Sequence, residues 1–247
     1  METLVMYNMK GGVGKTAGCV NLASLAALEK RRVLIWDLDP QGAASFYFKV
    51  SPGQRNNESK KIFENEGLQD VIRSTNYEYI DLVPASLSSR EADLHLKDIK
   101  HGKKRIRQLL QTVKDNYDYV FLDCPSGLSF LHEACFQAAK TLVMPVIPTT
   151  LSLRTYQMVM AFLKTHEFDI HLHCYFSMAD LRKKLHNEII ESCFANKDFL
   201  KNYIPYLSDV EKMGIFIAPV IEFSKSGYAA QCYKDIWQEL SQQIFTK

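Results

Sequence analysis

Short, almost continuously apolar segments alternate along this chain with segments that have a helical pattern. Leu4–Tyr7, Val33–Trp36 and Tyr119–Leu122 are three of the apolar segments, and their composition is typical of strands buried on both faces of a sheet. Thr16–Glu29, which lies between the first two, is predicted as a helix. Strands that alternate with helices in this way favour an α/β fold, with a mainly parallel sheet flanked by helices on both faces.

The alternation continues to the end of the chain. Lys49–Lys61 contains Pro and Asn residues and few apolar ones, so we expect an exposed loop there. No linker or internal repeat interrupts the pattern, and we expect residues 1–247 to form a single domain. The further predicted strands are Ile80–Val83, Leu142–Val146 and His171–Phe176, and the further predicted helices cover about Ile106–Val113, Leu131–Ala139, Arg154–Thr165, a stretch from about Asp180 and a last stretch from about Tyr228.

Composition narrows the class of protein. The 247 residues are 47% hydrophobic and carry a formal net charge of +2, which supports a sizeable core and does not by itself indicate nucleic-acid binding. The six cysteines are scattered without a Cys-x-x-Cys pair, so we expect buried thiols in a reducing compartment. Because no segment has the layout of a signal peptide or the length of a membrane helix, we expect a cytoplasmic protein.

The segment Met9–Thr16 follows the first predicted strand and opens the first predicted helix. Its glycines leave backbone N–H groups accessible to an anion, and the helix adds the positive end of its dipole at the same place. Lys15 can then reach the β- and γ-phosphates of a nucleotide, and the Thr16 hydroxyl can ligate Mg²⁺. The segment departs from the general phosphate-loop pattern, because Met9 replaces a glycine and Lys10 is an additional lysine. A chance glycine-rich turn is the alternative, but the strand–loop–helix context favours a nucleoside triphosphate site.

Three aspartates follow predicted strands. Asp37 and Asp39 come directly after Val33–Trp36, and Asp123 follows Tyr119–Leu122. In an open α/β sheet, ligands bind beyond the carboxyl ends of the strands, so we expect all three side chains at the edge where the phosphate loop lies. For any single one of these aspartates, the alternative is that it only forms a turn at the end of its strand. Their common position predicts carboxylates that hold magnesium and orient water.

These segments together resemble the ParA/MinD family of deviant Walker-type ATPases, and its ParA branch more closely. The resemblance implies a P-loop NTPase fold of the SIMIBI type and covers nearly the whole chain. It is weaker in the second half, where Phe176–Asp180 and Ile204–Tyr206 continue it. The segments that carry it most specifically are Lys10–Thr16, Asp37–Gly42, Tyr117–Asp123 and Pro148–Thr155.

The resemblance implies a role for each matching residue. Lys15 would neutralise phosphate charge in its own subunit, and Lys10 would reach the nucleotide of a second subunit, so that ATP becomes part of a homodimer interface. Thr16 would bind Mg²⁺ directly, with Asp37 and Asp123 holding the ion through water. Asp39 would orient the attacking water. The residues expected to contact ATP are Lys10, Gly11, Gly12, Val13, Gly14, Lys15, Thr16 and Ala17 around the phosphates, and Met178, Pro205 and Tyr206 beside the adenine.

The output that the resemblance implies is the positioning or segregation of a cargo, such as a plasmid, a chromosome locus or a protein assembly. An ATP-bound dimer would bind DNA without sequence specificity on the nucleoid, and a ParB-like or cargo-adaptor partner would stimulate an otherwise slow hydrolysis. Lys225 fits the basic position of the penultimate segment, whereas Gly227 replaces a residue that is commonly basic. Two further basic clusters are Arg182, Lys183 and Lys184, and Lys97, Lys100, Lys103, Lys104, Arg105 and Arg107. A solvated surface is the alternative for each cluster.

Two other outputs remain open at this point. Membrane cycling, as in the MinD branch, requires a lysine-rich amphipathic C-terminal helix; the last predicted helix carries few positive groups, so we expect no membrane binding. A metal-cluster or electron-transfer ATPase requires well-placed thiolates. Cys124 and Cys135 lie close to the expected site, but their flanking residues do not match such a protein.

Overall fold

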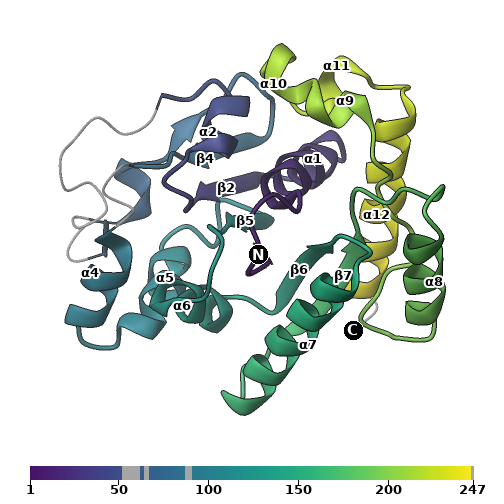
Figure 1. The fold of residues 1–247 in the computed structure, drawn as a ribbon. Coiled ribbons are helices and arrows are strands. Elements are labelled where there is room, and N and C mark those ends of the chain that lie inside the picture. The colour runs from purple at the N-terminus through teal and green to yellow at the C-terminus, as the bar shows by residue number, and fades with distance from the viewer. Residues whose placement is uncertain (52–61, 64–66, 87–90, 246–247) are drawn as a thin grey trace.

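The computed structural model describes residues 1–51, 62–63, 67–86 and 91–245 (Figure 1). Within this part, seven strands form one sheet in the order β3-β4-β2-β5-β1-β6-β7. All neighbouring pairs are parallel except β3 and β4. The strands are β1 (Glu2–Met6), β2 (Val33–Asp37), β3 (Arg73–Ser74), β4 (Ile80–Val83), β5 (Tyr119–Asp123), β6 (Thr141–Val146) and β7 (His171–Phe176).

Helices cover both faces of the sheet and form two separate cores (Figure 1). One core joins the sheet to α1, α2, α10, α11 and α12, and the other joins it to α4, α5, α6, α7 and α8. The predicted α/β class with a mainly parallel sheet is therefore confirmed. The helices are α1 (Lys15–Leu28), α2 (Ala43–Tyr47), α4 (Ala92–Asp98), α5 (Gly102–Gln111), α6 (Phe130–Ala138), α7 (Thr150–Thr165), α8 (Lys184–Cys193), α9 (Ser208–Glu211), α10 (Met213–Phe216), α11 (Val220–Phe223) and α12 (Tyr228–Phe245), with a 3-10 turn at Leu68–Asp70.

Three helices begin about four residues away from the predicted start, and one of them is α5, which begins at Gly102 and not near Ile106. α7 begins at Thr150 and not at Arg154, because the Thr149 side chain accepts a hydrogen bond from the Ser152 N–H and caps the helix. α8 begins at Lys184 and not near Asp180, because the Asp180 carboxylate accepts the Arg182 N–H at 3.2 Å in a turn before the helix. The predicted loop Lys49–Lys61 falls largely on residues 52–61, which lie outside the described residues.

Proline inside β6 does not interrupt the sheet. The pairing of β1 with β6 ends at Met6 and Val143. Pro145 lies beyond this pairing, so its missing N–H leaves no carbonyl oxygen of β1 without a hydrogen bond. Its carbonyl oxygen still accepts a hydrogen bond of 2.8 Å from the Asn8 side chain. Pro145 therefore marks the point where β1 leaves the sheet and the phosphate loop begins.

Helix α1 packs very closely on the sheet. A Cβ atom added to Gly18 would lie 2.2 Å from the Tyr175 hydroxyl and 3.0 Å from the Met6 Cε atom. Only glycine fits this contact without a shift of its neighbours. The close packing fixes the start of α1, and with it the phosphate loop, against β1 and β7.

Two further expectations concern side chains and membranes. All six cysteines are buried and none forms a disulfide, as the sequence predicts. Across the described ranges, no helix combines the length and the apolar character needed to cross a bilayer.

Candidate functional site

The loop between β1 and α1 has the backbone conformation of an anion-binding loop. Gly12 and Gly14 adopt positive φ angles of 71° and 90°, which favour glycine over residues with a Cβ atom. Gly14 is the N-cap of α1 and no side chain caps the helix there, so the first N–H groups of α1 point into the loop with no side-chain acceptor. This loop can therefore surround a phosphate group.

The loop is held in place from three sides. Asn8 is fully buried, and its carboxamide oxygen accepts the Lys10 N–H at 2.9 Å. The Met9 carbonyl oxygen accepts the Gly127 N–H at 2.9 Å, and the Val13 carbonyl oxygen accepts the Ser177 hydroxyl at 2.7 Å. Segments that follow β5 and β7 thus fix the loop, which makes it a preorganised site.

The two lysines of the loop have different surroundings. Lys15 is 8% exposed, and its ammonium group donates to the Lys10 carbonyl oxygen at 3.0 Å. Burial lowers the pKa of Lys15, while Asp123 and Asp39 favour its charged form. Lys10 is half-buried, and its Nζ lies 3.5 Å from the Ser152 hydroxyl at the start of α7. Lys15 therefore points into the loop, whereas Lys10 turns away from it toward α7.

Asp37 and Asp123 lie side by side at the ends of β2 and β5, where they are register partners. Both are almost completely buried. Asp37 accepts hydrogen bonds from the Ser45 N–H at 2.8 Å and the Ser45 hydroxyl at 2.7 Å through one oxygen, and its other oxygen has no partner. Neither oxygen of Asp123 has a hydrogen-bond partner of good geometry, although the Thr16 side chain lies close enough to lower the pKa of Asp123. Three buried carboxylate oxygens are therefore available to a ligand.

The electrostatics of these two aspartates favour a cation. Burial raises the pKa of Asp37 to about 6, although the hydrogen bonds from Ser45 act in the opposite direction and lower it. Burial and the Asp37 charge raise the pKa of Asp123 well above its ordinary value. Within the described part of the chain, no three His, Cys, Asp or Glu side chains are arranged as a metal site. A cation here would need further oxygen ligands, and phosphate oxygens, water and the Thr16 hydroxyl would supply them.

Asp39 occupies a more open position. It lies in the turn after β2, where its carboxylate accepts the Gln41 N–H at 3.0 Å and its carbonyl oxygen accepts the Gly42 N–H at 2.9 Å. Gly42 has a φ angle of 66° and starts α2. Asp39 is thus held by its own turn and stays partly exposed beside the buried pair.

The residues predicted to border adenine meet after β7. Met178 has a φ angle of 52°, and Ala179 next to it forms a parallel bridge with Pro205. The Tyr206 N–H donates to the Ala179 carbonyl oxygen at 3.0 Å, and the Tyr206 side chain is 59% exposed. The structure therefore brings these segments together, and Ser177 connects them to the phosphate loop.

The predicted basic residues lie on the surface, in two separate segments of the chain. Arg182 is paired with Asp180 at 2.8 Å, and Lys184 lies 3.5 Å from Glu188. Lys183 and Lys225 are exposed. Arg182 and Lys183 directly precede α8, Lys184 is its first residue, and Lys225 precedes α12.

Several residues that build the site were not predicted from the sequence. Asn8 and Ser177 hold the phosphate loop, Ser45 holds Asp37, and Ser152 contacts Lys10. Asn8 carries a local signal, because it directly precedes the loop segment. Ser45, Ser152 and Ser177 act across the fold, so their contacts appear only when the strands are assembled.

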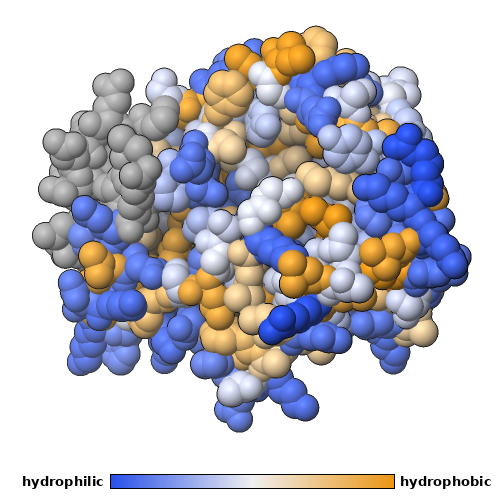
Figure 2. All heavy atoms as spheres, viewed as in Figure 1, coloured by the Kyte–Doolittle hydropathy of each residue, from blue (hydrophilic) through white to orange (hydrophobic). Residues whose placement is uncertain are grey.

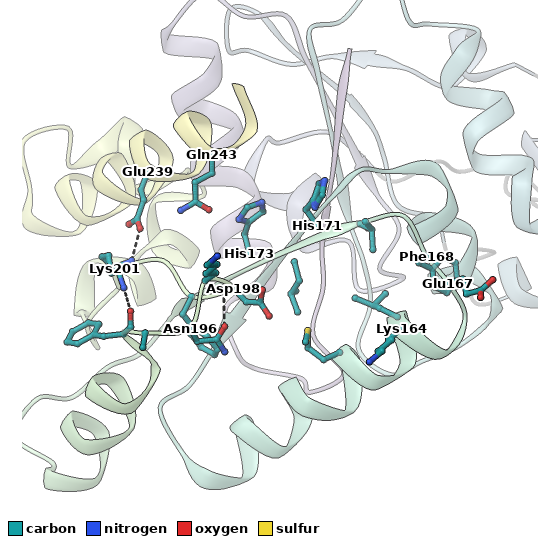
Figure 3. A pocket seen from close by; sticks show the side chains of 18 residues that line it. Lys164, Glu167, Phe168, His171, His173, Asn196, Asp198, Lys201, Glu239 and Gln243 are labelled. Carbon is teal, nitrogen blue, oxygen red and sulfur yellow. Dashed lines mark hydrogen bonds between the residues drawn. The ribbon is translucent and has the colours of Figure 1, made fainter. Parts of the chain in front are cut away.

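A separate cavity of about 810 Å³ lies beside the beginning of β7 (Figure 3). Its walls come from α7, α12, the start of β7 and the segment 194–201. None of the predicted nucleotide-site residues lines it. The site predicted from the sequence and this cavity are therefore two different places on the molecule.

Comparison with known proteins identifies the family. A family model described as an AAA domain matches residues 1–172, which include the phosphate loop and all three aspartates. The chain belongs to this family. It is 29% identical to the sporulation initiation inhibitor protein Soj of Bacillus subtilis over 97% of this chain and 98% of that protein. It is 27% identical to the chromosome-partitioning ATPase Soj of Treponema pallidum over 97% of this chain and 96% of that protein.

Solved structures confirm the fold of this AAA-domain protein. A protein assigned to plasmid partition in Borrelia burgdorferi B31, bound to AMPPNP, superimposes with a TM-score of 0.85 at 18% identity over 98% of this chain and 99% of that chain. Cobyrinic acid a,c-diamide synthase from Mycobacterium smegmatis, with a bound ATP analogue and magnesium, gives a TM-score of 0.80 at 20% identity over 99% and 96% of the two chains. Together with the relatives, these neighbours confirm the resemblance to the ParA/MinD family of P-loop ATPases.

Proposed function

We propose that this chain is a single-domain ParA-type ATPase switch that uses ATP and Mg²⁺ to position or segregate a cargo. The observation that carries the proposal is the pair of buried aspartates, Asp37 and Asp123, whose unpartnered oxygens lie at the strand edge beside Lys15 and the phosphate loop. The chromosome-partitioning relative and the nucleotide-bound structures of the same fold support this interpretation.

The residues of the site fit a magnesium–triphosphate complex. Mg²⁺, when bound, neutralises charge on the β- and γ-phosphates. Thr16 would hold the ion directly, and Asp37 and Asp123 would hold it through water molecules. Lys15 would exchange its hydrogen bond with the Lys10 carbonyl oxygen for phosphate oxygens, and these stronger partners would stabilise its charge.

Hydrolysis requires an oriented water and a stabilised phosphoryl group. Asp39 is partly exposed and fixed by its turn, so it would accept a hydrogen bond from the attacking water. Lys10 lies at the outer side of the loop and would leave Ser152 to reach the nucleotide of a second copy. A lysine shared in this way makes the ATP state dimeric, because the added contact exists only with the triphosphate.

The cycle would act through DNA and a partner protein. The ATP-bound dimer would bind nucleoid DNA through surface residues such as Arg182, Lys183, Lys184 and Lys225, all of which are exposed. Turnover would be slow until a ParB-like or cargo-adaptor partner stimulates it. Membrane cycling has less support, because Ile236 and Leu240 on the apolar side of α12 are fully buried in the core.

One set of variants tests the proposal. Lys15→Ala should weaken binding of a fluorescent ATP analogue by about 10- to 100-fold, since it removes a charge-assisted contact to phosphate. Asp39→Ala should keep binding and lower hydrolysis by about 100-fold or more, since only the water loses its partner. Nucleotide titration and phosphate release are the measurements.

The Asp39→Ala protein also tests the output. Loaded with ATP, it should be retained on nonspecific DNA at low salt, and retention should fall as salt rises. Lys15→Ala serves as the matched control and should not be retained. Equal ATP binding by wild type and Lys15→Ala would contradict the site, and an ATP-loaded Asp39→Ala protein that ignores DNA would contradict the DNA output alone.

A further inference from the structure

Strand β7 is the last strand at one edge of the sheet, and the main-chain groups of successive residues point in opposite directions. The His171 N–H donates to the Lys140 carbonyl oxygen at 2.7 Å, and the Ser177 N–H donates to the Val146 carbonyl oxygen at 2.9 Å. The odd-numbered residues of β7 therefore pair with β6. Because successive residues of a strand bond in opposite directions, the even-numbered residues present their N–H and C=O groups to the outer edge.

The chain itself covers only the second half of this edge. The Cys174 N–H donates to the Asp198 carbonyl oxygen at 2.6 Å, and the Cys174 carbonyl oxygen accepts the Leu200 N–H at 2.8 Å. The Phe176 carbonyl oxygen accepts the Ile204 N–H at 2.8 Å. Leu172 makes no such bond with any described residue, so the first half of β7 keeps an unused donor and acceptor on the main chain.

The 810 Å³ cavity of Figure 3 lies at this uncovered half. Leu163 and Phe168 belong with Leu172 to the core on the α7 side of the sheet and provide an apolar wall. His171, Glu239 and Gln243 provide a more polar wall near α12. An added strand would place alternate side chains against these two walls, so the walls fit an extended segment with alternating apolar and polar residues.

The charges around the cavity favour an acidic segment. Glu239 is already used, because it accepts the Lys201 N–H at 2.7 Å and the Asn202 N–H at 3.1 Å. Asp198 accepts the Tyr156 hydroxyl at 2.7 Å. On the rim of the cavity, Lys164 and Lys197 are exposed and form no ion pair with another described residue. Glu167 is the one exposed carboxylate among the described residues that line it.

We propose that the cavity beside β7 binds an extended, acidic peptide segment of a partner protein, which pairs with the main chain of Leu172 as an additional strand. This is strand addition at a sheet edge, in which main-chain bonds give affinity and alternate side chains give specificity. The site lies at the opposite end of β7 from Ser177 and the phosphate loop. Its residues are therefore distinct from those of the proposed nucleotide switch.

The probe is a capped hexapeptide of alternating glutamate and valine, titrated into the isotope-labelled full chain and followed by amide NMR signals. Shifts should concentrate at residues 170–174 and 194–199, and the Leu172 amide should gain protection from hydrogen exchange. Leu172→Pro removes the outward N–H without removing a bond to β6 and should lower affinity at least about tenfold. Because that variant also loses a buried side chain, Lys164→Glu with Lys197→Glu is a second variant, on the surface, that should weaken binding similarly.

Two matched peptides separate the possible outcomes. A version with N-methyl groups on alternate residues cannot pair along one edge and should not bind, and a lysine-for-glutamate version should bind several-fold more weakly. Binding that survives N-methylation would overturn the proposal in favour of a simple apolar groove. An absence of shifts at millimolar glutamate–valine peptide would overturn it as well.

Discussion

At the scale of single residues, the site depends on polar groups that the fold places out of contact with water. His132 is an example outside the phosphate loop. Its Nδ1 accepts the Ser129 N–H at 3.1 Å, and its Nε2 lies 3.1 Å from the Pro125 carbonyl oxygen, so the ring is neutral and donates through Nε2. Burial lowers the pKa of His132, although the hydrogen bond to Pro125 and the charge of Asp93 act in the opposite direction and raise it. This residue holds the segment 125–129, which follows Asp123 and contacts the loop.

His132 should therefore contribute to acid sensitivity of the fold. Between pH 7.5 and 5.5 an unfolded histidine takes up a proton, whereas the buried ring stays neutral, so the free energy of unfolding falls as the pH falls. His132→Gln can keep the capping box with Ser129 and cannot take up that proton. Urea unfolding at the two pH values should show a smaller loss of stability for this variant. A loss as large as that of wild type would show that His132 is not a source of the effect.

At the scale of elements, the close packing of α1 on the sheet positions the phosphate loop. Gly18 faces Tyr175 and Met6 with no room for a Cβ atom, and α1 carries Lys15 and Thr16 at its first turn. The contact at Gly18 therefore affects both the stability of the fold and the positions of Lys15 and Thr16. A shift of α1 at Gly18 would also move the phosphate loop.

Gly18→Ala should destabilise the protein by about 1–3 kcal/mol, because the helix or Tyr175 must shift. Gly214→Ala is the matched control, since an added Cβ there meets no atom within 4 Å, and its effect should stay within about 1 kcal/mol and tend to stabilise α10. Chemical denaturation measures both. If the two variants lose the same stability, the close packing of α1 is not what the structure indicates.

The strand and helix order could be predicted from sequence to a large extent. β7 has the predicted bounds His171–Phe176, and α1 differs from its prediction by one residue at each end, because apolar strands and a glycine-rich helix start are local signals. α2, α4, α9, α10 and α11 were not predicted, since helices of four to seven residues show too little periodicity. The start of α8 was predicted wrongly, because the Asp180 turn depends on the Arg182 and His186 contacts.

The motif residues of the candidate site could be predicted from the sequence, whereas the residues that hold them in place could not. Lys15, Thr16 and Asp37 stand in short segments whose spacing carries the chemistry. That Asp37 and Asp123 are register partners with unpartnered oxygens follows from the pairing of β2 with β5, which no local pattern encodes. The edge at Leu172 is equally a property of the assembled sheet.

At the scale of the whole molecule, the two ends of the sheet have different roles in this account. The carboxyl ends of the strands carry the phosphate loop and the aspartates, whereas the opposite end of β7 carries the cavity of Figure 3. The face viewed in Figure 2 carries apolar patches beside charged residues, and Ile215 and Phe216 of α10 are 78% and 52% exposed. A second copy or a partner therefore has more than one region to contact.

In the proposed cycle, ATP joins two copies of this chain through Lys10. The decisive experiment is sedimentation of the Asp39→Ala protein, with and without ATP and Mg²⁺, beside the double variant that also carries Lys10→Ala. We predict a monomer without nucleotide, a dimer with ATP, and a dimer weakened at least about tenfold when Lys10 is removed, while ATP binding persists. A protein that stays monomeric with saturating ATP and Mg²⁺, or a dimer that does not depend on Lys10, would contradict the account.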